Sequence, residues 1–158
     1  MEEVAGLICE RMASYSLVLM AKTISEQQLA LNRKLHDVNP DFGKRSGGAG
    51  LASRLPIALL RMHELGFCSS VLDYGTGKGL LVDRLKKELP SSIHVTGYDP
   101  AVERWSTKPT GKTDILTCLD VLEHVEIDFI DKVIKDIESL TKLFCYVVID
   151  LQPAVKSL

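Results

Sequence analysis

The sequence lacks the features that mark metal-bound, redox-active and membrane-spanning proteins. It has four cysteines in 158 residues and no C-x-x-C pair, which argues against a zinc ribbon or a redox motif. No apolar run reaches the roughly 20 residues that a membrane-spanning helix needs. The N-terminus is acidic, where a secretory signal would be basic. We therefore expect a cytoplasmic protein with no metal site and no membrane contact.

The few cysteines are also widely scattered along the chain. Free cysteine behaves as a small apolar side chain and is common in protein cores. At least two of the four lie in expected buried strands or beside them. We expect reduced core thiols at Cys9, Cys68, Cys118 and Cys145.

Net charge and aromatic content are low as well. A net charge of −2 at pH 7 gives no overall attraction to nucleic acid or membranes. The aromatic residues, 6% of the chain, are not interleaved with basic ones as in single-strand binders. Local basic residues could still meet a nucleic acid or an acidic small molecule, although such charges more often form a solvated face. They are Arg33, Lys34, Lys44, Arg45, Arg54 and Arg61.

What the chain does have is a glycine-rich loop between an apolar strand and a helix. Residues 71–79 read Val-Leu-Asp-Tyr-Gly-Thr-Gly-Lys-Gly. Alternating glycines let the backbone turn tightly and approach a ligand, next to the N–H groups at the start of a helix. Asp99 follows the next apolar run about twenty residues later, where a βαβ unit places a ribose-binding acid. This pattern indicates a nucleotide-cofactor loop. The alternatives are a tight strand–helix turn without a ligand for the glycines and an ordinary turn before Pro100 for Asp99.

Two residues separate the possible cofactor classes. A dinucleotide fingerprint, G-x-G-x-x-G, ends in a glycine that permits close helix–strand packing, and this chain has Leu80 in that slot. Asp73, just before the loop, would repel a pyrophosphate but suit a cationic amino group. Both residues favour S-adenosylmethionine over NAD.

These segments resemble the motifs of the class I S-adenosylmethionine-dependent methyltransferases. The first motif of that family is similar to residues 71–79, the second to residues 95–100, and the fourth-strand motif to residues 114–125, which include Leu-Glu-His. The resemblance implies S-adenosylmethionine as cofactor and a Rossmann-like α/β/α fold. The cofactor-binding residues that it implies are Asp73, Tyr74, Gly75, Thr76, Gly77, Gly79, Asp99, Pro100, Leu119 and Asp120.

The resemblance also implies individual roles. Asp73 and the glycine loop would hold the methionine moiety, and Asp99 would accept hydrogen bonds from both ribose hydroxyls. Leu119 and Asp120 would line the flank of the cofactor. His124 is a candidate base for a hydroxyl or amine acceptor, although a histidine at a strand-to-helix junction more often caps or packs. Small-molecule, protein and RNA acceptors all stay open.

The alternation of strand and helix after residue 51 predicts a three-layer α/β fold with a mostly parallel sheet. Expected strands cover residues 70–74, 93–98, 114–119 and 143–149, and expected helices cover residues 51–65, 80–89 and 127–140. The family's third strand and its last two strands have no counterpart here. The strand at 143–149 therefore has an open edge. The N-terminal helices, a second copy or a partner would cover that edge, or the chain is a fragment of a longer enzyme.

Residues 1–50 are expected to precede a methyltransferase domain at 51–158. They comprise helices over 2–19 and 25–35, the second with a capping box, Ser25 and Gln28. The glycine-bearing stretch 37–50 is interpreted as a lid over the cofactor or as an ordinary connector. Trp105 is expected to cover the sheet edge, with stacking on adenine as the alternative.

The sequence thus predicts an S-adenosylmethionine-dependent methyltransferase. An alternative is a non-catalytic S-adenosylmethionine-binding module that acts through a partner, because the missing C-terminal part is where many family members contact substrate. An NAD-dependent oxidoreductase is the weaker alternative. Preference between the two cofactors separates these classes.

Overall fold

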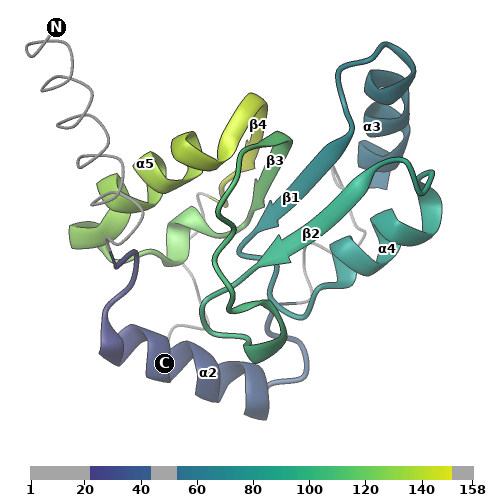
Figure 1. Cartoon of the computed structure of the whole chain (residues 1–158). Helices are drawn as coiled ribbons and strands as arrows, with labels where there is room; N and C mark the ends of the chain where they lie inside the picture. Colours follow the sequence, from purple (N-terminus) through teal and green to yellow (C-terminus); the bar gives the residue numbers. More distant parts are fainter. Residues whose placement is uncertain (1–21, 44–52, 151–158) are drawn as a thin grey trace, which may run out of the picture.

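The computed structural model describes residues 22–43 and 53–150, which form a four-stranded, all-parallel sheet with helices on both faces (Figure 1). The strand order is β2-β1-β3-β4. The strands are β1 (Ser70–Tyr74), β2 (His94–Tyr98), β3 (Thr113–Leu119) and β4 (Thr141–Val148). The helices are α2 (Glu26–Val38), α3 (Leu55–Glu64), α4 (Leu80–Glu88) and α5 (Ile130–Leu140). Short 3-10 turns are η3 (Glu103–Trp105), η4 (Leu122–His124) and η5 (Ile127–Phe129). The predicted α/β fold is confirmed.

The element boundaries follow the local signals in the sequence. The Ser25 hydroxyl accepts a hydrogen bond from the Gln28 N–H at 3.0 Å and caps α2, as the capping box predicts. α3 has Pro56 in its first turn, where the missing N–H costs least, and it begins at Leu55 rather than at the predicted residue 51. Between β2 and β3 the only regular element is η3, so the predicted absence of a third strand is confirmed.

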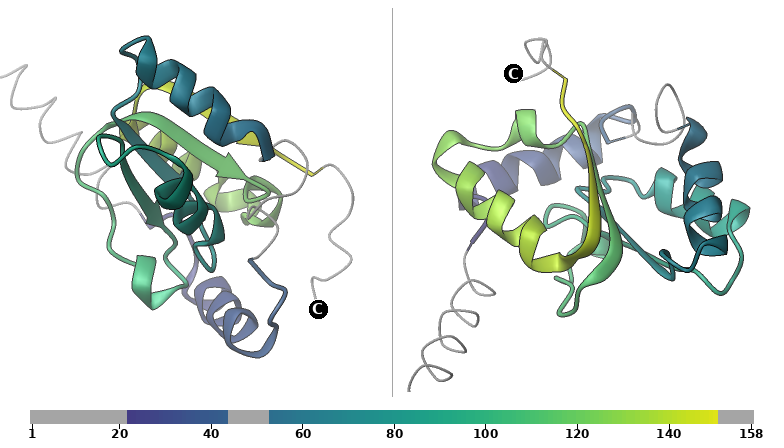
Figure 2. Two further views of the ribbon diagram at one scale, coloured as in Figure 1. Left: turned by 90° about the vertical axis from the view of Figure 1, so that its right-hand side faces the viewer. Right: turned by 90° about the horizontal axis from the view of Figure 1, so that it is seen from above.

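Two apolar clusters hold the layers together. Along β1, Val71 points to the face covered by α3 and α4, and Leu72 points to the face covered by α5. Both side chains are fully buried, as expected for a parallel sheet covered on two faces. Figure 2 shows the two layers seen from above, with α5 on one side of the sheet and α3 and α4 on the other.

A single carboxylate ties the amino ends of three strands. Asp114 Oδ2 accepts hydrogen bonds from the Ser69 N–H and hydroxyl and from the Ser70 N–H, while Lys142 Nζ lies 2.9 Å from Oδ1. The bonds from Ser69 and Lys142 hold the pKa of Asp114 well below its usual range. This end of the sheet is therefore fixed by a network far from the glycine loop, which lies at the opposite, carboxyl ends of the strands.

β4 has the open edge that the sequence predicts. It pairs with β3 on one side, and in the part of the chain that the structure describes no strand pairs with its other edge. Leu143, Phe144 and Val147 are 45%, 53% and 40% exposed. Cys145 is also exposed, so the prediction of a core thiol is wrong at this position, because one side of β4 is open. Cys68 and Cys118 are buried free thiols, and Cys9 lies outside the described residues.

Residues 22–43 and 53–150, the part of the chain that the structure describes, contain neither a membrane-spanning helix nor a metal-binding cluster. No helix there is long and apolar enough to cross a membrane. No group of three or more His, Cys, Asp and Glu side chains in the same ranges is arranged to hold a metal ion.

Candidate cofactor and active site

The glycine loop turns at the carboxyl end of β1 and leads into α4. Gly75, Gly77 and Gly79 have φ angles of +74°, +54° and +79°, which side chains with a Cβ rarely adopt. The loop is held to β2 because the N–H groups of Gly75 and Thr76 both donate to the Tyr98 carbonyl oxygen. This geometry confirms the predicted strand–loop–helix unit.

Asp99 lies at the end of β2 and faces this loop. Its Oδ2 accepts a hydrogen bond from the Gly77 N–H and its Oδ1 accepts one from the Ala101 N–H, both at 2.9 Å. The residue is 9% exposed. A carboxylate offers about four lone-pair positions, so each oxygen of Asp99 can accept a further hydrogen bond. Asp99 is thus fixed in place and still has acceptor capacity.

A pocket of about 90 Å³ opens beside Asp99, where the carboxyl ends of β1, β2 and β3 meet. It brings together five of the predicted site residues: Tyr74, Gly75, Asp99, Pro100 and His124. The other lining residues, which the sequence analysis did not single out for the site, are Thr23, Ile24, Gln28, Asn32, Val121, Val125, Glu126 and Val133. Ligands of open parallel sheets bind at this end of the strands.

The segment after α2 covers the glycine loop. A Cβ on Gly77 would lie 2.9 Å from the Cα and carbonyl oxygen of Gly43, so the two backbones are in close contact. Lys78 Nζ donates to the carbonyl oxygens of Asn39 and Pro40 at 3.0 and 3.1 Å. Residues 39–43 therefore lie against the glycine loop. The lid interpretation of residues 37–50 stays a prediction, and residues 44–50 fall outside the described residues.

His36, in the last turn of α2, fits against the same segment. Its ring packs edge-on against Phe42, and a Cβ on Gly43 would meet it at 2.8 Å. Burial lowers the pKa of His36, although the negative charge of Asp99 opposes the shift. The end of α2 is thus held next to the glycine loop by an uncharged imidazole at neutral pH.

Asp73 lies beneath the loop rather than in the pocket. It is 1% exposed, and its Oδ1 accepts a hydrogen bond from the Thr117 hydroxyl at 2.8 Å. Burial raises the pKa of Asp73 to about 6, against the opposing effect of the Thr76 and Thr117 hydroxyls. The predicted contact between Asp73 and an amino group of the cofactor stays a prediction.

We expect the variant Asp73→Asn to change how stability depends on pH. The folded state binds the proton more tightly than the unfolded state, so wild-type stability falls as pH rises from about 4 to 6 and stays lower above 6. The amide cannot ionise, so relative to wild type the variant should gain up to about 3 kcal/mol between pH 4 and pH 7. Urea unfolding at both pH values measures this difference. If the stability difference between the wild type and Asp73→Asn is the same at pH 4 and at pH 7, this prediction is wrong.

The side chain of Tyr74 belongs to a buried polar network. Its hydroxyl donates to Asp136 Oδ2 at 2.9 Å, and Lys108 Nζ lies 2.6 Å from Asp136 Oδ1. The Tyr74 ring packs edge-on against Tyr98 at 5.4 Å. Burial and the Asp136 charge raise the pKa of Tyr74. The hydroxyl of Tyr74 is therefore engaged inside the protein, while the ring forms part of the pocket wall.

The remaining predicted residues lie around the pocket without lining it. Thr76, Gly77 and Gly79 are buried in the loop, and Leu119 is 6% exposed in the core. Asp120 has a φ of +54°, and its N–H donates to the Val148 carbonyl oxygen. Of the two predicted site residues that follow β3, Asp120 and His124, it is His124 that lines the pocket.

His124 is exposed and ends the 3-10 turn η4. Capping of the next helix was one of the roles left open for His124. His124 does not cap α5, because this helix begins only at Ile130, with Phe129 in the cap position. His124 thus has a side chain at the pocket and no part in starting the next helix.

Trp105 packs over the start of α4. A Cβ on Gly79 would lie 2.7 Å from the Trp105 ring, and the ring contacts the apolar cluster beneath α4. Arg104 and Lys86 lie over the ring at 4.4 and 5.8 Å from its centre. Trp105 is not among the residues that line the pocket at Asp99. Its ring therefore packs on the start of α4, while the predicted cover of the sheet edge stays a prediction.

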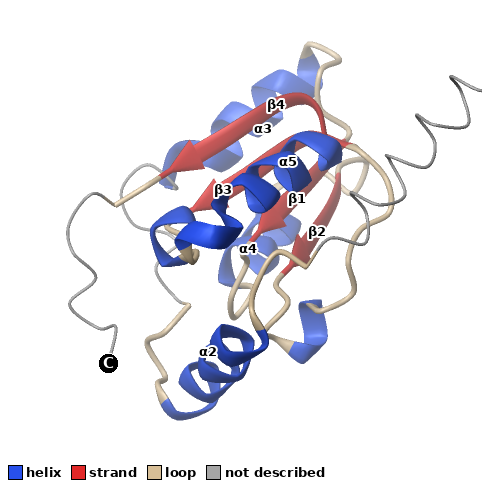
Figure 3. Cartoon of the chain, turned by 90° about the vertical axis from the view of Figure 1, so that its left-hand side faces the viewer, coloured by secondary structure: helices blue, strands red, loops and turns tan. Residues whose placement is uncertain are grey.

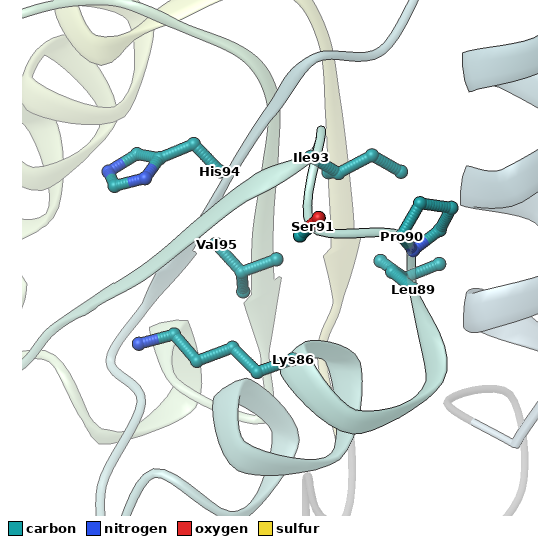
Figure 4. A pocket seen from close by; sticks show the side chains of 7 residues that line it. All are labelled: Lys86, Leu89, Pro90, Ser91, Ile93, His94 and Val95. Atoms are coloured by element: carbon teal, nitrogen blue, oxygen red, sulfur yellow. The ribbon is translucent and has the colours of Figure 1, made fainter.

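A second pocket, of about 280 Å³, lies at the other end of the sheet (Figure 4). Its walls come from the carboxyl end of α4 and the amino end of β2, and they contain none of the predicted cofactor residues. The lining residues are Lys86, Leu89, Pro90, Ser91, Ile93, His94 and Val95. This pocket is the larger of the two, but predicted cofactor residues line the smaller one at Asp99.

Comparison with known proteins agrees with the glycine loop and the parallel sheet. No curated protein matches the chain significantly. A family profile described as a methyltransferase domain matches residues 25–153, a range that includes α2, the glycine loop, Asp99 and all four strands. Because this match covers most of the sequence, the chain belongs to the methyltransferase domain family.

Proposed function

We propose that this chain binds S-adenosylmethionine at the carboxyl ends of β1, β2 and β3 and transfers its methyl group to an acceptor. The observation that carries the proposal is Asp99. Its two oxygens are fixed by the Gly77 and Ala101 N–H groups, it lines the pocket, and it retains acceptor capacity. Paired hydroxyls of a ribose are the donors that such a carboxylate fits.

The residues present fit an adenosyl ligand in chemistry, but the pocket is narrow. Small-molecule sites have typical volumes of about 300–1,000 Å³, whereas this one measures about 90 Å³. A complete cofactor therefore requires α2 or residues 39–43 to move outward. Lys78 holds that segment through two side-chain hydrogen bonds and through its N–H, which donates to the Gly43 carbonyl oxygen, so the movement has to break these three bonds.

When bound, S-adenosylmethionine supplies an activated methyl group, so the main task of the protein is alignment. Asp99 and the glycine loop would orient the adenosyl part. His124, exposed at the pocket wall, would take the proton of a hydroxyl or amine acceptor. All three acceptor classes that the sequence left open, small molecules, proteins and RNA, are compatible with this role.

The test of the cofactor is a calorimetric titration of the purified chain with S-adenosylhomocysteine, S-adenosylmethionine and NAD. We expect saturable binding of both adenosyl ligands and none of NAD. Binding of NAD alone would support the oxidoreductase instead. A folded chain that binds none of the three would overturn the proposal.

The variant His124→Ala tests the base. Once an acceptor is found by a screen for S-adenosylhomocysteine release, we expect the variant to lower turnover by about 100-fold or more. Its affinity for S-adenosylhomocysteine should stay unchanged, because the histidine would act on the acceptor. Full turnover by the variant would exclude this role.

A non-catalytic binding module remains the second candidate. It is favoured by the open, apolar side of β4, where a second copy or another protein would find uncharged residues from Leu143 to Val148. Such a module would bind the adenosyl ligands yet release no S-adenosylhomocysteine with any acceptor or cell extract. Release that rises with an added acceptor would favour the enzyme.

A further inference from the structure

The face that helix α2 turns toward the protein is unusual for a helix that packs on a core, because its centre is polar. None of its residues is buried, and its half-buried positions are 28, 29, 31, 32, 35 and 36. At 3.6 residues per turn these positions form one face, whose centre is Gln28 and Asn32, with Leu35 next to Gln28 and with Leu29 and Leu31 at the margins. Helices that pack on a core have apolar residues at the centre of the inward face. The centre of this face is polar.

The two amides lie over the candidate cofactor pocket. Gln28 and Asn32 both line it, together with Asp99 and Pro100. Gln28 Nε2 donates to Asn32 Oδ1 at 2.9 Å. One bond between two amides leaves further donors and acceptors on both side chains. These groups face the end of β2 at which a ribose would be held.

Contacts at both ends hold α2 across the site. At its start, the Ser25 N–H donates to a carboxylate oxygen of Glu126 at 2.9 Å. Beyond its end, Lys78 holds the backbone of residues 39 and 40. Figure 3 shows α2 beyond the carboxyl ends of β1 and β2, separate from the other helices. The helix is therefore supported at its ends, with its polar centre over the pocket.

We propose that Gln28 and Asn32 bind the adenosyl part of the cofactor, so that α2 forms the second wall of the site opposite Asp99. Carboxamides suit this ligand, because Asn and Gln can pair with the amino group and a ring nitrogen of adenine at once. The polar centre of the inward face is then explained by a polar ligand between helix and sheet. This inference rests on the proposed function, since it assigns residues to the same cofactor.

The test compares the double variant Gln28→Ala/Asn32→Ala with the control Gln27→Ala, which removes the same side chain from the exposed position next to Gln28. The titrated ligands are S-adenosylhomocysteine and 5′-methylthioadenosine, which lacks the amino-acid part. Loss of the amide hydrogen bonds should weaken both ligands about 10-fold or more in the double variant. The control should bind both as the wild type does.

The pattern of losses decides between interpretations. Equal weakening of both ligands supports contact with the adenosyl part, and weakening of S-adenosylhomocysteine alone would overturn that assignment. Unchanged or tighter binding by the double variant would mean that α2 only obstructs the pocket. If the wild type binds neither ligand, the proposed function itself fails, which is a different result from failure of the α2 assignment alone.

A second measurement does not depend on affinity. Hydrogen exchange of the α2 amides, followed by mass spectrometry, should slow in the wild type on saturation with 5′-methylthioadenosine, because the helix gains contacts through its inward face. The double variant, compared at saturating ligand, should show less of this slowing. Equal slowing in both proteins would contradict the role of the two amides.

Discussion

The variant Asp99→Ala is expected to lower the affinity for S-adenosylhomocysteine by at least about 100-fold. Hydrogen bonds to a charged group contribute about 1.5–3 kcal/mol each, and a ribose held by Asp99 would donate two. The substitution also removes the acceptor of the Gly77 and Ala101 N–H groups, which takes away one of the hydrogen bonds that hold the glycine loop to the end of β2. Both effects act in the same direction. Calorimetric titration measures the change.

The matched control for Asp99→Ala is Asp83→Ala. Asp83 is an exposed acid in the first turn of α4, where it pairs with Arg104 at 3.2 Å. Removing it changes the net charge by the same amount but touches no pocket residue, so affinity should stay within about 2-fold of wild type, since an exposed ion pair contributes little. If both variants bind as the wild type does, Asp99 does not hold the ligand.

The variant Asp136→Ala is expected to lower the free energy of unfolding by about 3 kcal/mol. Asp136 is 1% exposed on the inner face of α5, where it accepts the Tyr74 hydroxyl and pairs with Lys108. Alanine would leave a buried hydroxyl without its acceptor and would remove the carboxylate that pairs with Lys108, and each loss is costly. Lys108 is partly exposed, so water can satisfy part of its charge.

Urea unfolding checks this value against two comparison variants. Asp131→Ala removes an exposed acid from the same helix and should change stability by less than about 0.5 kcal/mol. Asp136→Asn keeps an acceptor for Tyr74 and should fall between wild type and Asp136→Ala. A loss below about 1 kcal/mol in Asp136→Ala would show that the network contributes little to stability.

Local patterns were sufficient to predict the part of the site that depends on neighbouring residues. The glycine loop and Asp99 belong to one βαβ unit, and the rule that parallel strands end at the same edge brought them together. The capping box at Ser25 and the short connection around Trp105 were also readable, because turn and cap preferences act over a few residues.

Contacts between distant segments could not be predicted. Asp136 meets Tyr74 across 62 positions, and Ser25 meets Glu126 across 101. One signal was available for the first pair: Asp136 interrupts the apolar face that Val133, Ile137 and Leu140 form on α5. A charged residue at such a position needs a buried partner. No comparable signal predicted that α2 lies over the pocket, because a polar helix face is normally expected to face solvent.

The exposure of Cys145 shows another limit. The apolar run that contains it predicted a strand, and the strand forms. The open edge was predicted too, and one edge of β4 has no pairing strand in the described ranges. The core-thiol prediction for Cys145 rested on the apolar run alone and did not take that open edge into account. An apolar run therefore predicts that a strand forms, but it does not predict whether other elements cover the strand and bury its side chains.

The most direct test of the account is to map the binding site by ¹H–¹⁵N NMR during titration with S-adenosylhomocysteine. Two pockets compete, one at Asp99 and one at the amino end of β2. The account predicts saturable shifts in the amide signals of Gly75, Gly77 and Asp99, with further shifts in α2. No shifts in the folded chain, or shifts confined to residues 91–95, would contradict binding at Asp99.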